Sequence, residues 1–154
     1  MRGRCKVSRS SVKNLATKPS ALLSSLSDEE LARKWAKETK RLVLSMLGRA
    51  LFAGHEPAYP IKIRWVAMDE DEWGDASLKK YKSGETFLIR LNKSLLNPNV
   101  HSRDLALFVF VHELGHCLSY GATDAAEESR TRVYGDHGAL WGVEYASLWE
   151  SLFD

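Results

Sequence analysis

Hydrophobic residues recur at helical spacing between residues 27 and 54. Ser27 is followed three residues later by Glu30, the pattern of a capping box, in which hydroxyl and carboxylate bond the free backbone amides at a helix start. The apolar positions that follow, up to Gly54, are Leu31, Trp35, Leu42, Val43, Met46, Leu47, Ala50 and Leu51. This spacing predicts a long amphipathic helix that packs on the core.

The pattern then changes to alternation of apolar and polar residues. Residues 61–67 alternate strictly enough to predict a half-buried strand. Residues 76–82 and 86–91 read as two more strands, and Ser83-Gly84 between them suits the turn of an antiparallel hairpin. The acidic run 69–72 is expected to be a solvated loop, and residues 92–99 a connection.

Helical patterns return in the last third of the chain. Residues 105–111 are apolar on every side, which indicates that a helix over 102–120 lies within the core. A second amphipathic helix is predicted to begin at His137 and to place one set of residues on a single face: His137, Trp141, Tyr145, Leu148 and Leu152. The sequence therefore predicts an α+β fold with a long first helix, a small three-stranded sheet and two closing helices.

Length and composition favour one globular domain. The chain has 154 residues, of which 44% are hydrophobic and 27% are charged. The net charge is +2, but residues 1–26 hold six basic and no acidic residues, which leaves −4 for the remainder. We expect a basic, flexible leader over 1–26, able to contact nucleic acid and also similar in composition to a transit peptide, and a single domain over 27–154. Outside the leader we find no interleaving of aromatic and basic residues that supports nucleic-acid binding.

The apolar stretches and the cysteines indicate the cellular compartment in which the chain is expected. The longest apolar stretch, 42–54, is interrupted by Ser45 and Arg49 and is too short to span a bilayer, so no membrane partner is expected. Cys5 and Cys117 are the only cysteines and suggest no disulfide framework. A reducing, intracellular and thus cytoplasmic setting is expected.

The segment HELGH at 112–116 carries the candidate chemistry. His112 and His116 are four residues apart, so a helix places both imidazoles on one face, where they can share one zinc ion. Glu113 lies beside that face and is suited to accept a proton from the attacking water. Gly115 would allow a neighbouring element to approach closely. Cys117 points to another face of the helix and is expected to be a small core residue.

A catalytic zinc usually needs a third protein ligand. His137 is the first choice, because packing of Trp141 would aim it inward; the carboxylates Asp124, Glu127 and Glu128 remain alternatives. Tyr134 either stabilises the oxyanion of peptide hydrolysis or anchors a loop. The two remaining histidines, His55 and His101, have no partner spacing and are expected to be exposed.

Three segments resemble the SprT-like zincin metallopeptidases and related small HExxH proteins. They are HELGH at 112–116, DHGALW at 136–141 and FLIRLNKSLL at 87–96, and together they lie within residues 87–141. The resemblance implies a leading helix, about three strands, a metal helix and a closing helix that contributes His137. Some family members act on proteins bound to DNA, which the basic leader would suit. These 154 residues contain no CxxC motif, so the Cys-rich ribbon that such proteins often carry is not expected here. A compact version is also compatible with a phage or mobile-element origin.

These observations favour a zinc-dependent metallopeptidase that hydrolyses protein or peptide substrates. The alternative is a zincin-fold binding or interaction module, associated with nucleic acid through residues 1–26, in which zinc is structural or catalysis is lost. Glu113 favours the enzyme, because a purely structural metal site has no need of an ionisable residue beside its histidines. The sequence leaves the substrate, the cleavage preference and the oligomeric state open.

Overall fold

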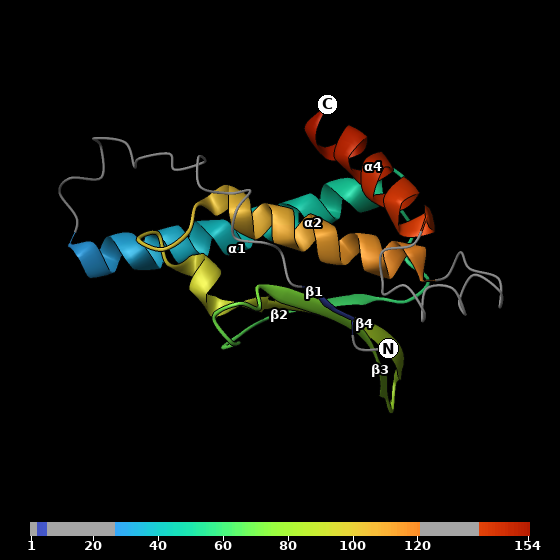
Figure 1. The fold of residues 1–154 in the computed structure, drawn as a ribbon, viewed down its shortest axis with the longest axis horizontal. Helices are drawn as coiled ribbons and strands as arrows, with labels where there is room; N and C mark the ends of the chain where they lie inside the picture. Colours follow the sequence, from blue (N-terminus) through green and yellow to red (C-terminus); the bar gives the residue numbers. More distant parts are fainter. Residues whose placement is uncertain (1–2, 6–26, 121–138) are drawn as a thin grey trace.

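The chain folds as an α+β structure in which helices cover one side of a small sheet. The computed structural model describes residues 3–5, 27–120 and 139–154. In chain order the elements are β1 (Gly3–Cys5), α1 (Asp28–Phe52), β2 (Ile61–Val66), β3 (Gly74–Tyr81), β4 (Gly84–Asn92), the 3-10 helix η3 (Lys93–Leu96), α2 (Arg103–Ser119) and α4 (Ala139–Phe153). Helices α1 and α2 run side by side above the sheet, and α4 packs against both of them (Figure 1).

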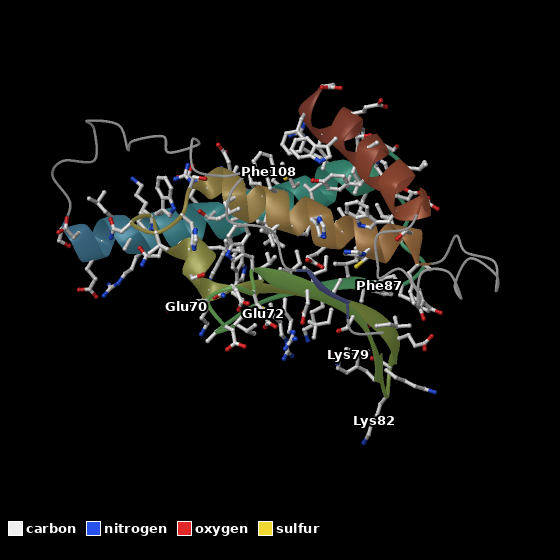
Figure 2. The ribbon with its side chains drawn as sticks, in the orientation of Figure 1. Glu70, Glu72, Lys79, Lys82, Phe87 and Phe108 are labelled. Carbon is white, nitrogen blue, oxygen red and sulfur yellow. The ribbon has the colours of Figure 1, made fainter. Side chains whose placement is uncertain are left out.

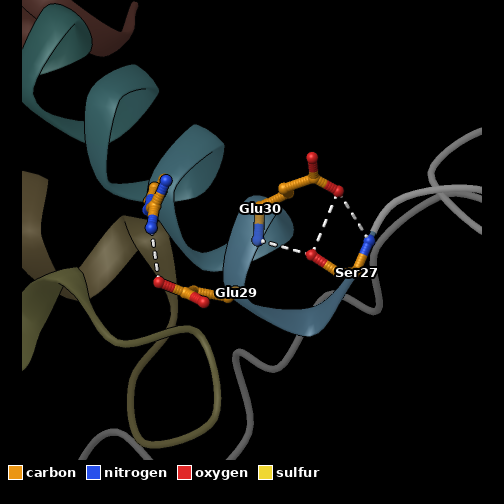
Figure 3. Close-up of polar contacts among 4 residues, drawn as sticks. Ser27, Glu29 and Glu30 are labelled. Atoms are coloured by element: carbon orange, nitrogen blue, oxygen red, sulfur yellow. Dashed lines mark hydrogen bonds and ion pairs between the residues drawn. The ribbon is translucent and has the colours of Figure 1, made fainter.

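Helix α1 begins where the capping box predicted. The Glu30 backbone N–H donates to the Ser27 hydroxyl at 3.2 Å, and the Glu30 carboxylate accepts from the Ser27 backbone N–H at 2.9 Å (Figure 3). The Ser27 hydroxyl also donates to the Glu30 carboxylate at 3.0 Å, and the two bonds that the carboxylate accepts from Ser27 lower the pKa of the Glu30 carboxyl group. At its other end the helix is closed by Ala53, and Gly54 follows with φ +95°, a conformation that glycine adopts without strain. Both ends predicted for this helix are therefore confirmed.

The sheet is mixed, with strand order β1-β3-β4-β2. The three strands expected from the alternation are all present: β2 pairs with β4 in parallel, and β3 pairs with β4 as an antiparallel hairpin. The hairpin turn differs in detail from the prediction. Tyr81 pairs with Gly84, so the loop residues are Lys82 and Ser83, while Gly84 opens β4 with φ +125°.

Strand β1 was not predicted from the sequence. It lies in the basic leader and pairs antiparallel with β3, with Gly3 opposite Ala76 and Cys5 opposite Gly74. The other leader residues, 1–2 and 6–26, lie outside the described residues, so the division into a leader and a domain stays a prediction. The strand adds a fourth member to the sheet at the edge beside β3.

The hydrophobic core lies between α2 and the sheet and continues to α1 and α4. Helix α2 is buried along most of its length, as its apolar sequence predicted. Its side chains Phe110 and Leu114 are 0% and 1% exposed, and they belong to the same core cluster as Ile89 and Leu91 of β4 and Leu148 of α4. Burial of this extent fixes α2 in place, and with it the HELGH segment. None of the described helices is both long and apolar enough to cross a lipid bilayer.

The C-terminal end of α4 is joined to the end of α1. The Arg49 guanidinium donates to the backbone carbonyl of Leu152 at 2.7 Å, and His55 Nε2 lies 2.9 Å from the Ser151 hydroxyl. His55 is therefore half-buried in a contact between two helices. His101 is half-buried too, with its ring edge-on to Trp73 at 6.0 Å. The prediction that these two histidines are exposed is wrong, because both meet elements distant in the sequence.

The acidic run at residues 69–72 is a loop, as expected, and one side chain organises it. The Asn92 side-chain amide donates to the backbone carbonyls of Asp69 at 3.2 Å and Glu72 at 2.7 Å, and the Asn92 backbone N–H donates to the Trp73 carbonyl at 2.8 Å. Figure 2 shows Glu70 and Glu72 near one end of the sheet and Lys79 and Lys82 at the hairpin end. The sheet is thus charged oppositely at its two ends.

Candidate metal site

The HELGH segment brings two imidazole nitrogens together on α2. His112 Nε2 and His116 Nε2 lie 3.3 Å apart, and the two rings meet at an angle of 71°. His116 is 6% exposed and His112 is half-buried. At this separation one nitrogen can donate a weak hydrogen bond to the other, or both can bind the same ion. The predicted placement of the two histidines on one face is confirmed.

An aromatic wall from α4 faces the two histidines. The Trp141 ring lies 4.9 Å from the His112 ring and 5.5 Å from the His116 ring, and Tyr145 stacks on Trp141 at 4.7 Å. Helix α4 can approach this closely because position 115 is glycine. A Cβ atom there would lie 3.1 Å from Trp141 Nε1. The expectation that Gly115 permits close approach of a neighbouring element is confirmed, and so is the inward face formed by Trp141, Tyr145 and the buried leucines of α4.

Glu113 lies on the sheet side of α2, with its side chain 1% exposed. Its neighbour on the sheet is Gly74, the first residue of β3. A Cβ atom on Gly74 would lie 3.3 Å from Glu113 Cγ, 2.8 Å from Val109 Cγ1 and 3.1 Å from the Arg90 carbonyl oxygen. Only glycine leaves room for the helix to pack this closely against the strand, so Gly74 sets the position of the carboxylate. The sequence alone did not single out this residue.

Cys117 is a core residue, as expected. It is 1% exposed, and burial raises the pKa of its thiol, with the Glu113 carboxylate adding to the effect. A thiol with a raised pKa is neutral at physiological pH, whereas metal ligation and nucleophilic attack both require the thiolate. Cys117 therefore contributes packing beside the glutamate and supplies no reactive group.

The remaining predicted site residues lie outside the described residues. They are His137, Tyr134 and the three alternative carboxylates Asp124, Glu127 and Glu128, all of which fall within 121–138. Among residues 27–120 and 139–154, no group of three or more histidine, cysteine or acidic side chains is arranged to hold a metal ion. The described residues thus supply two histidines of the expected set, and the third ligand stays a prediction.

Two further features of the surface were missed by sequence reasoning. A polar pocket of about 460 Å³ lies away from the histidine pair, where the end of α1 meets α4, and His55, Glu144 and Ser151 are among the residues that line it. The β3–β4 hairpin carries three lysines and a tyrosine, at Lys79, Lys80, Tyr81 and Lys82, and Lys62 Nζ lies 5.9 Å above the Tyr81 ring. The expectation that basic and aromatic residues interleave nowhere outside the leader is therefore wrong, because the run 79–82 was interpreted only as part of a strand.

Comparisons with protein-family models, with curated proteins and with solved structures find no match to this chain. Its function must therefore be inferred from the site itself. The elements of that site are a histidine pair with converging nitrogens, a buried glutamate one residue along the same helix, and an aromatic wall from α4.

Proposed function

We propose that this chain is a zinc-dependent peptidase whose active site is built on HELGH at 112–116. The observation that carries the proposal is the 3.3 Å separation of His112 Nε2 and His116 Nε2. Two nitrogen ligands of a tetrahedral zinc, each about 2.0–2.1 Å from the ion, lie about 3.3 Å from one another. The pair is therefore spaced as two ligands of one zinc would be, in side chains that a buried helix already holds in position.

Glu113 is the general base of the proposed reaction. Its carboxylate takes the proton of the attacking water and passes it to the amine of the leaving peptide, while the two histidines hold the metal. Zinc, when bound, lowers the pKa of its water to about 7 and polarises the carbonyl to be cleaved. Burial of Glu113 supports this role, because a side chain that is 1% exposed is held in one position by the packing around it, and a general base must be held in position.

His137 is proposed as the third ligand, in preference to Asp124, Glu127 and Glu128. Support comes from the way the chain re-enters the described structure at Ala139 and reaches the histidine pair at Trp141. His137 is only four residues from Trp141, and four residues span at most about 14 Å. The same proposal gives Tyr134 the role of stabilising the oxyanion during peptide hydrolysis.

The element order supports a zincin-like assignment of the fold. A leading helix, a small sheet, a helix with the histidine pair and a closing helix follow one another, which is the order implied by the resemblance to SprT-like peptidases. Fold likeness alone does not establish an activity. The assignment is therefore proposed together with the site and depends on it.

Metal analysis tests the proposal directly. We expect about one zinc per chain in the purified protein and almost none in His116→Ala, because two nitrogens remain where three are needed. His55→Ala is the matched control, since it removes a histidine that contacts Ser151 far from the pair, and it should keep its zinc. A parent protein that takes up no zinc when the ion is supplied would end the metallopeptidase proposal.

A second candidate function is favoured by the lysine-rich hairpin. Lys62 Nζ lies 5.9 Å from the ring of Tyr81, which is 40% exposed, and Lys79, Lys80 and Lys82 are neighbours of Tyr81 along the chain. This part of the sheet therefore offers both phosphate contacts and a ring for base stacking. The alternative is thus a nucleic-acid-binding module, with the leader as a further basic segment.

This alternative predicts that single-stranded DNA binds with an affinity that falls steeply as salt rises, and that Tyr81→Ala weakens it by about 1–3 kcal/mol. Fluorescence anisotropy at several salt concentrations measures both effects. Tyr59→Ala is a suitable control, because it removes a tyrosine whose ring packs edge-on against Phe87 and which is not part of the run 79–82. Equal binding by Tyr81→Ala and the parent would exclude the hairpin as a stacking surface.

A further inference from the structure

The outer edge of β3 is covered over only part of its length. Strand β3 runs from Gly74 to Tyr81 with β4 along its inner edge. Along its outer edge β1 pairs with the first three residues, Gly74, Asp75 and Ala76. Within the described ranges nothing else pairs with that edge. The sheet therefore offers an edge at which an extended backbone can align, and one end of it is taken by the chain's own N-terminal segment.

The covered end is the end that reaches the candidate active site. Gly74 is the β3 residue that lies beside Glu113, since a Cβ atom added to it would lie 3.3 Å from Glu113 Cγ. Cys5 is its partner across the ladder, and directly opposed Cα atoms in an antiparallel pair lie about 4.5–5.5 Å apart. The backbone of β1 thus runs within one strand spacing of the residue that positions the proposed general base. Figure 1 shows β1 below the middle of α2, consistent with this register.

We propose that β1 occupies the edge along which an extended peptide substrate aligns, so that the N-terminal segment inhibits the enzyme of which it is part. This inference rests on the proposed peptidase function and adds its regulation. Backbone pairing to a sheet edge is largely independent of sequence, so a tethered strand and a substrate can compete for the same edge. Because β1 belongs to the same chain as β3, their pairing is intramolecular, which favours β1 over a substrate in solution.

Paired variants separate pairing from side-chain effects. The N–H groups of successive strand residues point to opposite sides, so one of Arg4 and Cys5 directs its N–H toward β3. The double variant Arg4→Pro/Cys5→Pro removes that donor whichever residue supplies it, whereas Arg4→Ala/Cys5→Ala loses the same side chains and keeps both donors. Neither substitution touches the proposed metal ligands or Glu113.

The expected result is that the proline variant hydrolyses an unfolded protein substrate about tenfold faster than the alanine variant, which corresponds to β1 being docked about nine-tenths of the time. Zinc content should be equal in both. A second readout does not depend on activity: the backbone amides of Gly74 and Ala76, which point toward β1 while that of Asp75 points toward β4, should exchange with deuterium faster in the proline variant only. A synthetic peptide of residues 1–10 should slow hydrolysis by the proline variant.

Each contrary outcome has a distinct meaning. Equal rates in the two variants, or a slower rate in the proline variant, overturn the inference and leave the peptidase proposal intact. Zinc-loaded protein that hydrolyses nothing, in the parent and in both variants, overturns the peptidase proposal and this inference with it. Unchanged exchange at Gly74 and Ala76 also overturns the inference, because it shows that β1 does not protect that edge.

Discussion

Replacing Glu113 by glutamine is expected to lower peptide hydrolysis by about 10²- to 10⁴-fold, the contribution of a positioned general base. Glutamine has nearly the same shape and fits the 1% exposed site, so α2 and its histidines should stay in place. The amide cannot accept the proton of the attacking water at neutral pH. The measurement is kcat/KM on a broad unfolded-protein substrate, with zinc content determined on the same preparation.

Two comparisons make this experiment decisive. Glu150→Gln on the exposed side of α4 makes the same chemical change away from the site and should leave both zinc and kcat/KM unchanged. If Glu113→Gln retained full activity, the base would have to be another residue and the proposed mechanism would be wrong. Loss of zinc in Glu113→Gln would instead assign the carboxylate to the support of the metal site.

The largest effect on stability is expected at Gly74. Gly74→Ala places a Cβ atom 2.8 Å from Val109 Cγ1 and 3.1 Å from the Arg90 carbonyl oxygen, and the latter belongs to a paired backbone that cannot move freely. Overpacking of this kind costs about 1–3 kcal/mol of the free energy of unfolding. Urea denaturation should show a lower midpoint for the variant with an unchanged slope.

Gly142→Ala is the matched control for this change. Gly142 lies in α4, and a Cβ atom added to it would have no neighbouring atom within 4 Å, so alanine there meets open space and should raise helix stability by about 1 kcal/mol. If Gly74→Ala lowers the free energy of unfolding and Gly142→Ala raises it, the effect at Gly74 is caused by contact with α2 and not by the loss of a glycine as such. A neutral Gly74→Ala would mean that β3 and α2 can separate at little cost.

The elements whose signals are local were predicted well. Three such signals are the capping box at Ser27, the apolar residues on all sides of α2 and the alternation in β2. Each reflects contacts within one element or with a hydrophobic core of any kind, so composition and spacing are enough to predict these elements. Strand β1 differs, because Gly3–Cys5 has no pattern of its own and forms a strand only by pairing with β3. The half-buried state of His55 likewise depends on Ser151, 96 positions away.

In the candidate site, too, the features set by local sequence were predictable and those set by distant contacts were not. Helical spacing is enough to place His112 beside His116 and to leave Gly115 facing a neighbour. The importance of Gly74 could not be predicted, because it arises where a strand start meets a helix 39 residues further along the chain. The lysines at 79–82 are visible in the sequence as charges, but only the folded sheet brings Lys62 of β2 over the ring of Tyr81 in β3.

The attachment of α4 to α1 has a mechanical consequence. The bonds to Ser151 and Leu152 hold the helix at its C-terminal end, while Trp141, which faces the histidines, lies eleven residues away. That separation is about 16 Å along a helix, so a rotation of about 10° about the held end displaces Trp141 by about 3 Å. The place of Trp141 beside the two histidines therefore depends on the angle at which the C-terminal end of α4 is held.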